Sequence, residues 1–392
     1  MASKAVYIDS FSYGTMHEQY NSAMFLSCSY VFDDIIYCVG KDSYKHTSKL
    51  IDLIHNKDYK KKIIYVSGLN NSRLALFIRL IISSLQNIRL LFYFNKEYVL
   101  IYNFNNFISL FIVNSINKVL NKKILIVCHS ELAFLVNKSV SKNIIYKLRT
   151  KILRYFFLEQ KFKIANNLFF LVLSDSIKKN LQSIIPKEKL AHFISIDHPY
   201  IFKSKLPLHE HKDLKIGIIG TMAQEKGADI LIEIAKKLDL LNRKDISILI
   251  IGRILCDFKI FQEEGIGLPD DLGQSFLNRD EFNEKISSLD YVLYLYPVNT
   301  YKYTASGSLM DSINIERPII SFKNDYFKYI FDKFGQLGFL VNDTHEMILL
   351  IEELLVCRSA SIDIQFSKIK EKLSPLSIKD HFRTELIKNK II

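Results

Sequence analysis

The sequence predicts an α/β protein with two consecutive domains, each built around a parallel β-sheet. Short apolar runs alternate with helical patterns along the 392 residues, which is typical of parallel strands joined by helices. The charged, proline-containing stretch at 203–213 lacks periodicity and is expected to be a linker. A chain of this length is also expected to form two or three domains.

The first domain is expected to occupy residues 1–202. Strands are expected at 4–9, 34–39, 63–67, 98–102, 123–128, 168–173 and 192–196, and helices at 70–87 and 143–165, among others. The stretch 98–117 carries no charge and is long enough to span a bilayer, but its five asparagines would be costly in hydrocarbon. We therefore expect a buried strand followed by a helix there, and no transmembrane segment.

The second domain is expected to occupy residues 214–360 and, like the first, to be Rossmann-like. Strands are expected at 214–219, 246–251, 291–295 and 318–322, helices at 228–241 and 307–315, and a helix–strand–helix set at 325–356. The tail at 361–392 is helical in pattern and has no strand partner. It is expected to pack back on the first domain.

The cysteine pattern and the first residues indicate a cytoplasmic protein. Five scattered cysteines include no Cys-x-x-Cys pair, so reduced thiols are expected in place of a disulfide framework or a zinc site. Asp9 lies where a signal peptide would need an apolar run. The sequence shows no cluster of metal-ligating residues, and we expect neither a metal nor another cofactor.

Positive charge is concentrated in the first domain. The chain has 53 Lys and Arg against 41 Asp and Glu, a net charge of +12, and residues 118–163 hold 11 basic residues against two acidic ones. The segment 142–163 interleaves these cations with aromatic residues, which suits an anionic membrane surface. A solvated helix face explains the same pattern equally well. Nucleic acid is not an expected partner, because no recognition motif for it is present.

Glycines and a lysine follow the first strand of the second domain. In an open parallel sheet, ligands bind beyond the carboxyl ends of the strands. The segment from Gly220 to Gly227 ends in Lys226-Gly227 at the start of a helix, and it can offer a cation and backbone N–H groups to phosphate. It lacks the ending of a P-loop. The alternative is an ordinary strand–helix turn with a surface lysine.

Two further loops of the second domain are candidate anion sites. Residues 303–308 precede a helix whose N-terminus favours an anion, with Asp311 one turn later. The alternative is a simple helix cap, since Ser308 and Asp311 have the spacing of a capping box. Gly252-Arg253 follows another strand, and Arg253 could pair with a phosphate or with a neighbouring carboxylate.

Histidines and glutamates follow two strands of the first domain. Gly14, His17 and Glu18 come after the first strand, and His129 and Glu131 come after the strand at 123–128. Such side chains could face one cleft and move protons. The alternative is that each histidine has a structural role.

Together, these segments resemble the GT-B glycosyltransferases, specifically the group 1 family of nucleotide-sugar enzymes, family four. IGIIGTMAQEKGADILIEIAKKL resembles that family's glycine-to-Lys-Gly segment, SILIIGR its next strand, and LDYVLYLYPVNTYKYTASGSLMDSINIERPIIS its donor-site block. VLSDSIKKNL and ISIDHPY resemble the last strands of the acceptor-side domain. The HSE at 129–131 lies where the family often has a histidine loop.

The sequence departs from this family at two places. The family's two glutamates, eight positions apart, correspond to Tyr303 and Asp311, so only a shortened carboxylate remains. The family's arginine beside the first glycine is Thr221 here, and Arg253 could replace it. A branch of such enzymes from bacterial polysaccharide clusters has a Ser-Gly loop in place of the first glutamate, and the chain resembles that branch.

The resemblance implies two Rossmann-like domains that face a cleft, and it assigns roles to residues. The implied donor-binding residues are Gly220, Thr221, Lys226, Gly227, Gly252, Arg253, Tyr303, Ser306, Gly307, Ser308 and Asp311. The implied catalytic residues are His17, His129, Glu131 and Lys226, and the acceptor-side residues are Gly14, His17 and Glu18.

The implied function is transfer of a sugar from a nucleoside diphosphate sugar, without a metal and with retention of configuration. The acceptor would be a saccharide or lipid-linked molecule of bacterial surface polysaccharide assembly, reached from the inner face of the plasma membrane. Two alternatives remain open: a nucleotide-sugar epimerase of the same fold, and a non-catalytic member that binds nucleotide or membrane.

Overall fold

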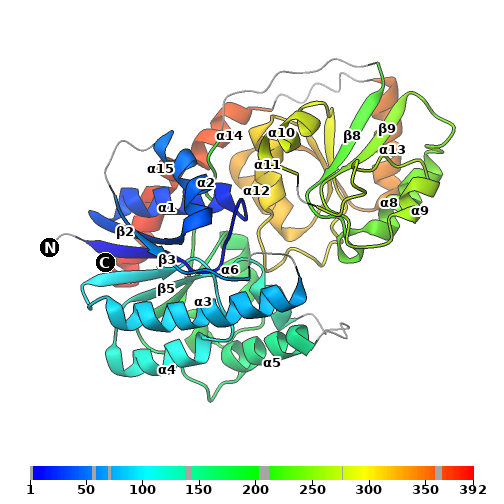
Figure 1. Ribbon diagram of the computed structural model, residues 1–392. Coiled ribbons are helices and arrows are strands. Elements are labelled where there is room, and N and C mark those ends of the chain that lie inside the picture. Colours follow the sequence, from blue (N-terminus) through cyan, green and yellow to red (C-terminus); the bar gives the residue numbers. More distant parts are fainter. Residues whose placement is uncertain are drawn as a thin grey trace. The chain divides into compact units, whose positions relative to one another are not determined.

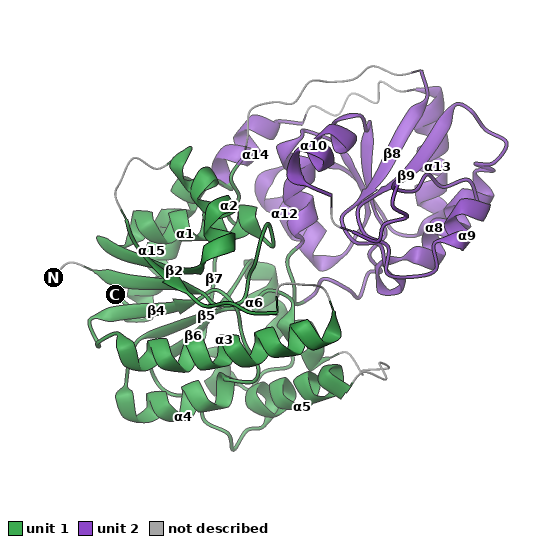
Figure 2. Cartoon of the chain, viewed as in Figure 1, with its two compact units in different colours: residues 1–201, 303–305, 373–392 green, residues 202–302, 306–372 purple. Residues whose placement is uncertain are grey.

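The computed structural model describes residues 3–54, 59–68, 72–136, 144–202, 212–275, 277–357 and 364–392 (Figure 1). The chain forms two compact units, which Figure 2 distinguishes by colour. Unit 1 comprises residues 1–201, 303–305 and 373–392, and unit 2 comprises residues 202–302 and 306–372. Most of the expected linker, at 203–211, lies outside the described residues.

Unit 1 contains a seven-stranded sheet in the order β3-β2-β1-β4-β5-β6-β7, and every pairing is parallel. The strands are β1 (Lys4–Asp9), β2 (Asp34–Gly40), β3 (Lys60–Ile64), β4 (Tyr98–Tyr102), β5 (Ile124–Val127), β6 (Leu168–Val172) and β7 (Phe193–Ser195). The predicted α/β class is therefore confirmed for this unit.

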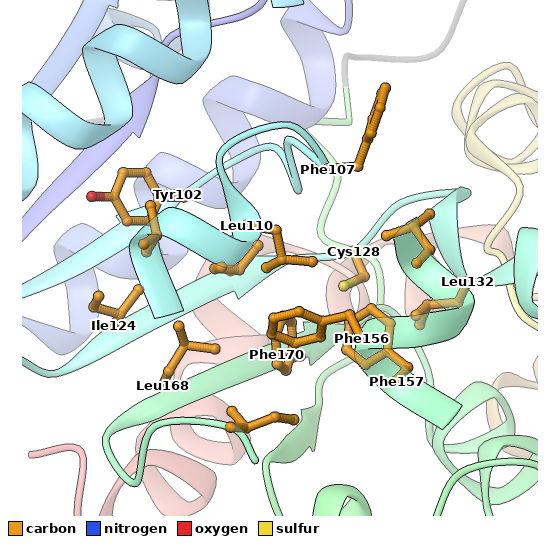
Figure 3. Packing of buried hydrophobic residues seen from close by; sticks show 14 of the residues in the cluster. Tyr102, Phe107, Leu110, Ile124, Cys128, Leu132, Phe156, Phe157, Leu168 and Phe170 are labelled. Carbon is orange, nitrogen blue, oxygen red and sulfur yellow. The ribbon is translucent and has the colours of Figure 1, made fainter. Parts of the chain in front are cut away.

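Helices cover both faces of this sheet. One face packs against α1 (Glu18–Val31), α2 (Lys41–Asp52) and the chain's last helix, α15 (Pro375–Lys388). The other face packs against α3 (Arg73–Tyr93), α4 (Leu110–Leu120) and α5 (Ile144–Leu158), where Phe156, Phe157 and Phe170 form the dense core of Figure 3. Three short helices complete the unit: a 3₁₀ turn at Glu131–Leu135, α6 (Asp175–Leu181) and α7 (Lys187–Leu190).

The third strand begins earlier than the sequence predicted. It was expected at 63–67, but β3 begins at Lys60 and pairs with β2 from Ile36 to Gly40. Three lysines open this strand because it is the edge of the sheet, where charged side chains remain in water. Lys60 is 3.2 Å from Asp34 on the neighbouring strand. Apolar periodicity alone does not find a strand of this kind.

Unit 2 contains a five-stranded parallel sheet in the order β12-β11-β10-β8-β9. The strands are β8 (Leu214–Ile219), β9 (Ile246–Ile251), β10 (Tyr291–Tyr294), β11 (Ile319–Phe322) and β12 (Gly338–Val341). The helices are a 3₁₀ turn at Gln224–Lys226, α8 (Ala228–Lys237), α9 (Lys259–Glu263), α10 (Arg279–Ser287), α11 (Gly307–Asn314), α12 (Asp325–Phe334), α13 (Thr344–Val356) and α14 (Phe366–Lys372).

The charge-free stretch at 98–117 forms the predicted strand and helix, β4 and α4. Its five asparagines are buried, and those on α4 bond to neighbouring loops. The Asn114 amide donates to the Lys163 carbonyl and accepts from the Ala165 N–H. Within the described residues, α3 alone is long and apolar enough to cross a bilayer, and half of its apolar window is buried, as in core helices of soluble proteins.

We predict that Asn114→Ala lowers the free energy of unfolding of unit 1 by about 1–3 kcal/mol. The substitution leaves the buried Ala165 N–H without its partner and removes the bond to the Lys163 carbonyl. Urea unfolding followed by circular dichroism measures the change. Ser115→Ala, at the exposed neighbouring position on α4, is the control and should stay within about 0.5 kcal/mol. An equally small effect of Asn114→Ala would contradict this account of α4.

Candidate active site

The carboxyl ends of several unit 1 strands bring polar side chains to one edge of the sheet. His17 follows β1, Asn103 follows β4, His129 follows β5 and His198 follows β7. These strands are all parallel, so their carboxyl ends lie at the same edge. The sequence predicted that His17 and His129 could face one cleft, but it did not single out Asn103 or His198.

Two predicted histidines lie close together at this edge. The rings of His17 and His129 are stacked, with centroids 6.0 Å apart. His17 precedes α1 in the left-handed conformation, with φ of 55°, and its side chain is exposed. Two further rings that the sequence did not indicate complete the cluster. Tyr20 packs edge-on against His129, with ring centroids 4.7 Å apart, and the His198 ring lies 4.9 Å from that of Tyr20.

One hydrogen bond fixes the tautomer of His129. Its Nε2 lies 2.8 Å from the backbone carbonyl of Asn103, and a carbonyl can only accept, so Nε2 carries the proton. Nδ1 of the neutral ring is then left as a hydrogen-bond acceptor. Burial lowers the pKa of His129, with the Asn103 carbonyl acting in the opposite direction. The lowered pKa favours the uncharged form of the ring.

A buried chain of amides and a carboxylate supports Asn103. Its side chain donates to Asn21 at 2.8 Å, and Asn21 donates to Asp9 at 2.8 Å. Asp9 also accepts a hydrogen bond from the Ser12 N–H. Burial raises the pKa of Asp9, and the hydrogen bonds from Ser12 partly oppose this increase. The sequence analysis missed this network, although Asn103 follows β4 directly and offered a signal.

Glu131 contacts its own loop and an arginine on α5. Its carboxylate accepts the His129 N–H at 2.7 Å and lies 3.8 Å from the Arg149 guanidinium. Arg149 also stacks over the ring of Phe134 at 4.1 Å. Burial raises the pKa of Glu131, and Arg149 opposes the increase. Through these contacts, Glu131 holds the loop that carries His129.

The remaining acceptor-side residues lie on the loop and helix after β1. The Gly14 N–H donates to Asp42 at 3.0 Å, and its φ of 53° favours glycine. Glu18 is in the first turn of α1, and its carboxylate is 3.9 Å from His46 on α2. Both residues therefore connect this loop to α2.

In unit 2, the glycines after β8 and β9 are required by close backbone contacts. A Cβ on Gly252 would lie 2.0 Å from the Gly220 carbonyl oxygen, and one on Gly227 would lie 2.3 Å from the Leu295 carbonyl oxygen. The two loops continue to pair beyond the strands, since the Met222 N–H donates to the Arg253 carbonyl. Thr221 and Arg253 are therefore held on adjacent, paired segments.

The N-terminus of α11 lies against the first of these loops. Ser306 is its N-cap and accepts from the Leu309 N–H, so the expected capping box beginning at Ser308 is wrong. The Ser308 hydroxyl instead bonds to the hydroxyls of Ser306 and Tyr296. A Cβ on Gly220 would lie 3.8 Å from Cβ of Ser308, so the glycine turn touches the start of α11, where Gly307 is exposed.

Lys226 and Asp311 have partners that the sequence did not reveal. Lys226 ends the 3₁₀ turn, and its Nζ lies 5.9 Å from the centre of the Tyr296 ring. The ring of Tyr301 stacks on the same Tyr296 ring, with centroids 4.1 Å apart. Asp311 forms a 2.8 Å ion pair with Arg279 at the start of α10. Arg279 therefore contacts one of the residues that the sequence predicts to bind the donor.

Tyr303 belongs to a different compact unit from the other predicted donor-binding residues. Residues 303–305 belong to unit 1, whereas Ser306 and the helix after it belong to unit 2. The Tyr303 side chain is 8% exposed and packs in the core cluster of unit 1 that α3, α4 and α5 cover. Its aromatic body serves this packing, which a glutamate could not provide.

The architecture is that of known solved structures, although no protein-family model and no curated protein matches the chain. HepE of Anabaena, solved with UDP and glucose, matches with a TM-score of 0.61 and 12% identity over 98% of this chain and 100% of its own. TarM of S. aureus matches with a TM-score of 0.60 and 12% identity over 98% of both chains. The lipopolysaccharide outer core galactosyltransferase WaaB matches with a TM-score of 0.55 and 15% identity over 98% of this chain and 99% of its own.

These likenesses establish the GT-B fold for this chain. The matches extend over nearly the whole length of each protein, and both parallel sheets agree with the fold that the sequence predicted. At such low sequence identity, the likeness shows the fold alone. The chemistry of the site must be inferred from its residues.

We predict that stability falls on acidification because of His198. Its ring is 6% exposed, and burial lowers its pKa from 6.5 to about 3. Between these values the unfolded chain binds the proton and the native state does not, so stability is lost as pH falls below about 6.5, by up to ~1.4 kcal/mol per pH unit. His198→Gln should flatten this dependence in urea unfolding between about pH 6.5 and 4.5. His345→Gln, at an exposed position, is the control, and an unchanged slope in His198→Gln would refute the assignment.

Proposed function

We propose that the chain is a glycosyltransferase that moves a sugar from a nucleoside diphosphate sugar to an acceptor. The observation that carries this proposal is in unit 2, where the glycine turn after β8 touches the N-terminus of α11 beside Lys226. Backbone N–H groups at a helix start, together with a cation, suit a diphosphate. HepE, which has the same fold, was solved with UDP and with UDP-glucose.

The proposed mechanism stabilises the departing diphosphate electrostatically. Lys226, Arg253 and the amides at Ser306–Ser308 would face the negative charge that grows as the glycosidic bond breaks, so no metal would be needed. Asp311 would accept hydrogen bonds from the ribose, with Arg279 holding its carboxylate in place. We propose retention of configuration, although Tyr303 replaces the carboxylate expected there.

Unit 1 would hold the acceptor. A neutral His129, with Nε2 bonded to Asn103, presents Nδ1 as an acceptor for a hydroxyl proton. Its stacked neighbour His17 adds a second polar ring at the same edge of the sheet. We propose a saccharide or lipid-linked acceptor of bacterial surface polysaccharide assembly, bound by a peripheral protein at the cytoplasmic face of the membrane. The structural neighbour WaaB, a lipopolysaccharide outer core galactosyltransferase, supports this class.

We predict that Lys226→Ala reduces turnover by a factor on the order of 10²–10³, because one stabiliser of the leaving charge is lost. Its free energy of unfolding should change by no more than about 0.5 kcal/mol. A panel of nucleoside diphosphate sugars, first screened by thermal shift, provides the donor, and release of nucleoside diphosphate measures turnover. Lys237→Ala, exposed at the end of α8, is the matched control.

The same assay separates the alternatives. Near-full turnover in a folded Lys226→Ala protein would make the Lys226-Gly227 segment an ordinary turn and remove the donor-site assignment. Interconversion of nucleotide sugars without an acceptor would favour the epimerase, and binding without any turnover would favour a non-catalytic member.

We predict that transfer activity survives EDTA. The charges of Lys226 and Arg253 act on the diphosphate in place of a divalent cation. Turnover is measured with the same donor before and after chelation, at constant ionic strength, with a metal-dependent transferase as the control. Complete loss that is reversed by Mg²⁺ or Mn²⁺ would contradict this mechanism.

A further inference from the structure

The side of α3 that faces solvent is apolar. Of the exposed residues on this helix, only Arg73 and Arg89 are charged. The exposed apolar side chains include Leu74 (68%), Phe77 (40%), Ile78 (38%), Ile81 (37%), Leu85 (58%) and Phe92 (60%). At 3.6 residues per turn, these six positions fall in a sector of about 100° and form a stripe about 27 Å long. We call them the α3 stripe.

The buried side of α3 is the more polar one. Arg79, Ser83 and Asn87 are among its buried residues, and each has a specific partner. Ser83 and Asn87 both bond to the hydroxyl of Ser10, and Arg79 donates to the Gly68 carbonyl. These buried bonds fix the rotation of the helix, so the α3 stripe cannot turn inward without breaking them.

The neighbouring helices α4 and α5 add positive charge and no negative charge. Together, α3, α4 and α5 contain eight Lys and Arg residues and no Asp or Glu. On α5, Lys147, Lys151 and Arg154 are exposed at spacings that place them on one face. Ile144 and Leu148 are exposed beside them, at 79% and 48%.

All three helices lie on the same face of the unit 1 sheet, as Figure 1 shows. Their solvent sides therefore point away from the sheet in the same general direction. We call this surface the α3–α5 face. It combines a long apolar stripe with cations, and the described helices that form it contribute no carboxylate.

We propose that the α3–α5 face docks on an anionic lipid bilayer, with α3 lying along the membrane surface and inserting its stripe. Anionic headgroups complement the cations, and hydrocarbon accepts the apolar side chains. A second copy of this chain is a poorer occupant, because symmetric pairing would set cations against cations. The sequence placed the membrane contact on 142–163 alone, part of which lies outside the described residues. The proposal does not depend on transferase activity.

A single tryptophan tests insertion directly, because the chain has none of its own. In the full-length Leu85→Trp protein, we expect a blue-shifted fluorescence maximum with vesicles containing phosphatidylglycerol, and quenching by brominated acyl chains. Leu376→Trp, equally exposed at 52% on α15 at the opposite face of the sheet, is the control and should show neither effect. No shift in Leu85→Trp, or equal shifts in both, would overturn the proposal.

Paired substitutions test the two components of binding. Ile81→Gln with Leu85→Gln should weaken binding to anionic vesicles, measured by sedimentation, by about a hundredfold, since each buried apolar side chain contributes roughly a factor of ten. Leu376→Gln with Ile387→Gln on α15 should leave it unchanged. Circular dichroism and thermal melting confirm that both proteins are folded.

The salt dependence of vesicle binding distinguishes the contribution of the cations from that of the α3 stripe. Lys147→Gln with Lys151→Gln should weaken binding at low salt, and should match the wild type near 1 M salt, where the Debye length is about 3 Å. Sedimentation velocity without vesicles tests the competing occupant. A wild-type dimer that Ile81→Gln with Leu85→Gln converts to monomer, with no vesicle binding, would assign the face to a second copy and overturn the proposal.

Discussion

The parallel direction of every strand is the constraint on which the rest of the molecule depends. Each strand must be followed by a return connection, so the loops that leave the carboxyl ends collect at one edge of each sheet. In unit 1 this edge gathers His17, His129 and His198 from segments far apart in the chain. In unit 2 it brings the turns at Gly220 and Gly252 so close that a side chain on Gly252 would overlap the backbone.

Buried amides then give these edges their specificity. Asn103 is the example, since its carbonyl decides which nitrogen of His129 is protonated while its side chain continues the network through Asn21 to Asp9. An apolar core would tolerate small rotations of the helices, whereas a satisfied polar network permits one arrangement. The five buried asparagines of 98–117 therefore help to fix this apolar stretch as a strand and a helix packed inside unit 1.

The sequence was sufficient for the parts of the fold set by local pattern and for the segments that resemble a known family. Central strands such as β1 and β4 have the bounds that the sequence predicted, 4–9 and 98–102. Partners distant in the chain could not be inferred: neither the Arg279–Asp311 pair nor the packing of Tyr20 against His129 has a local signature. The sequence allowed a helix cap in this loop but placed a capping box on Ser308 and Asp311, whereas the structure has the cap at Ser306.

The outward face of α3 shows why composition alone misleads for such a helix. The sequence of α3 is apolar enough for a core helix or for a membrane-spanning helix. In either case, all its apolar residues would lie in the same kind of environment. The structure separates them, because Ser83, Asn87 and Arg79 hold the polar side against the sheet. The apolar residues of the α3 stripe remain on the solvent side, next to cations. In the proposed docking, the hydrocarbon of a bilayer would contact the apolar side chains and its anionic headgroups would contact the cations.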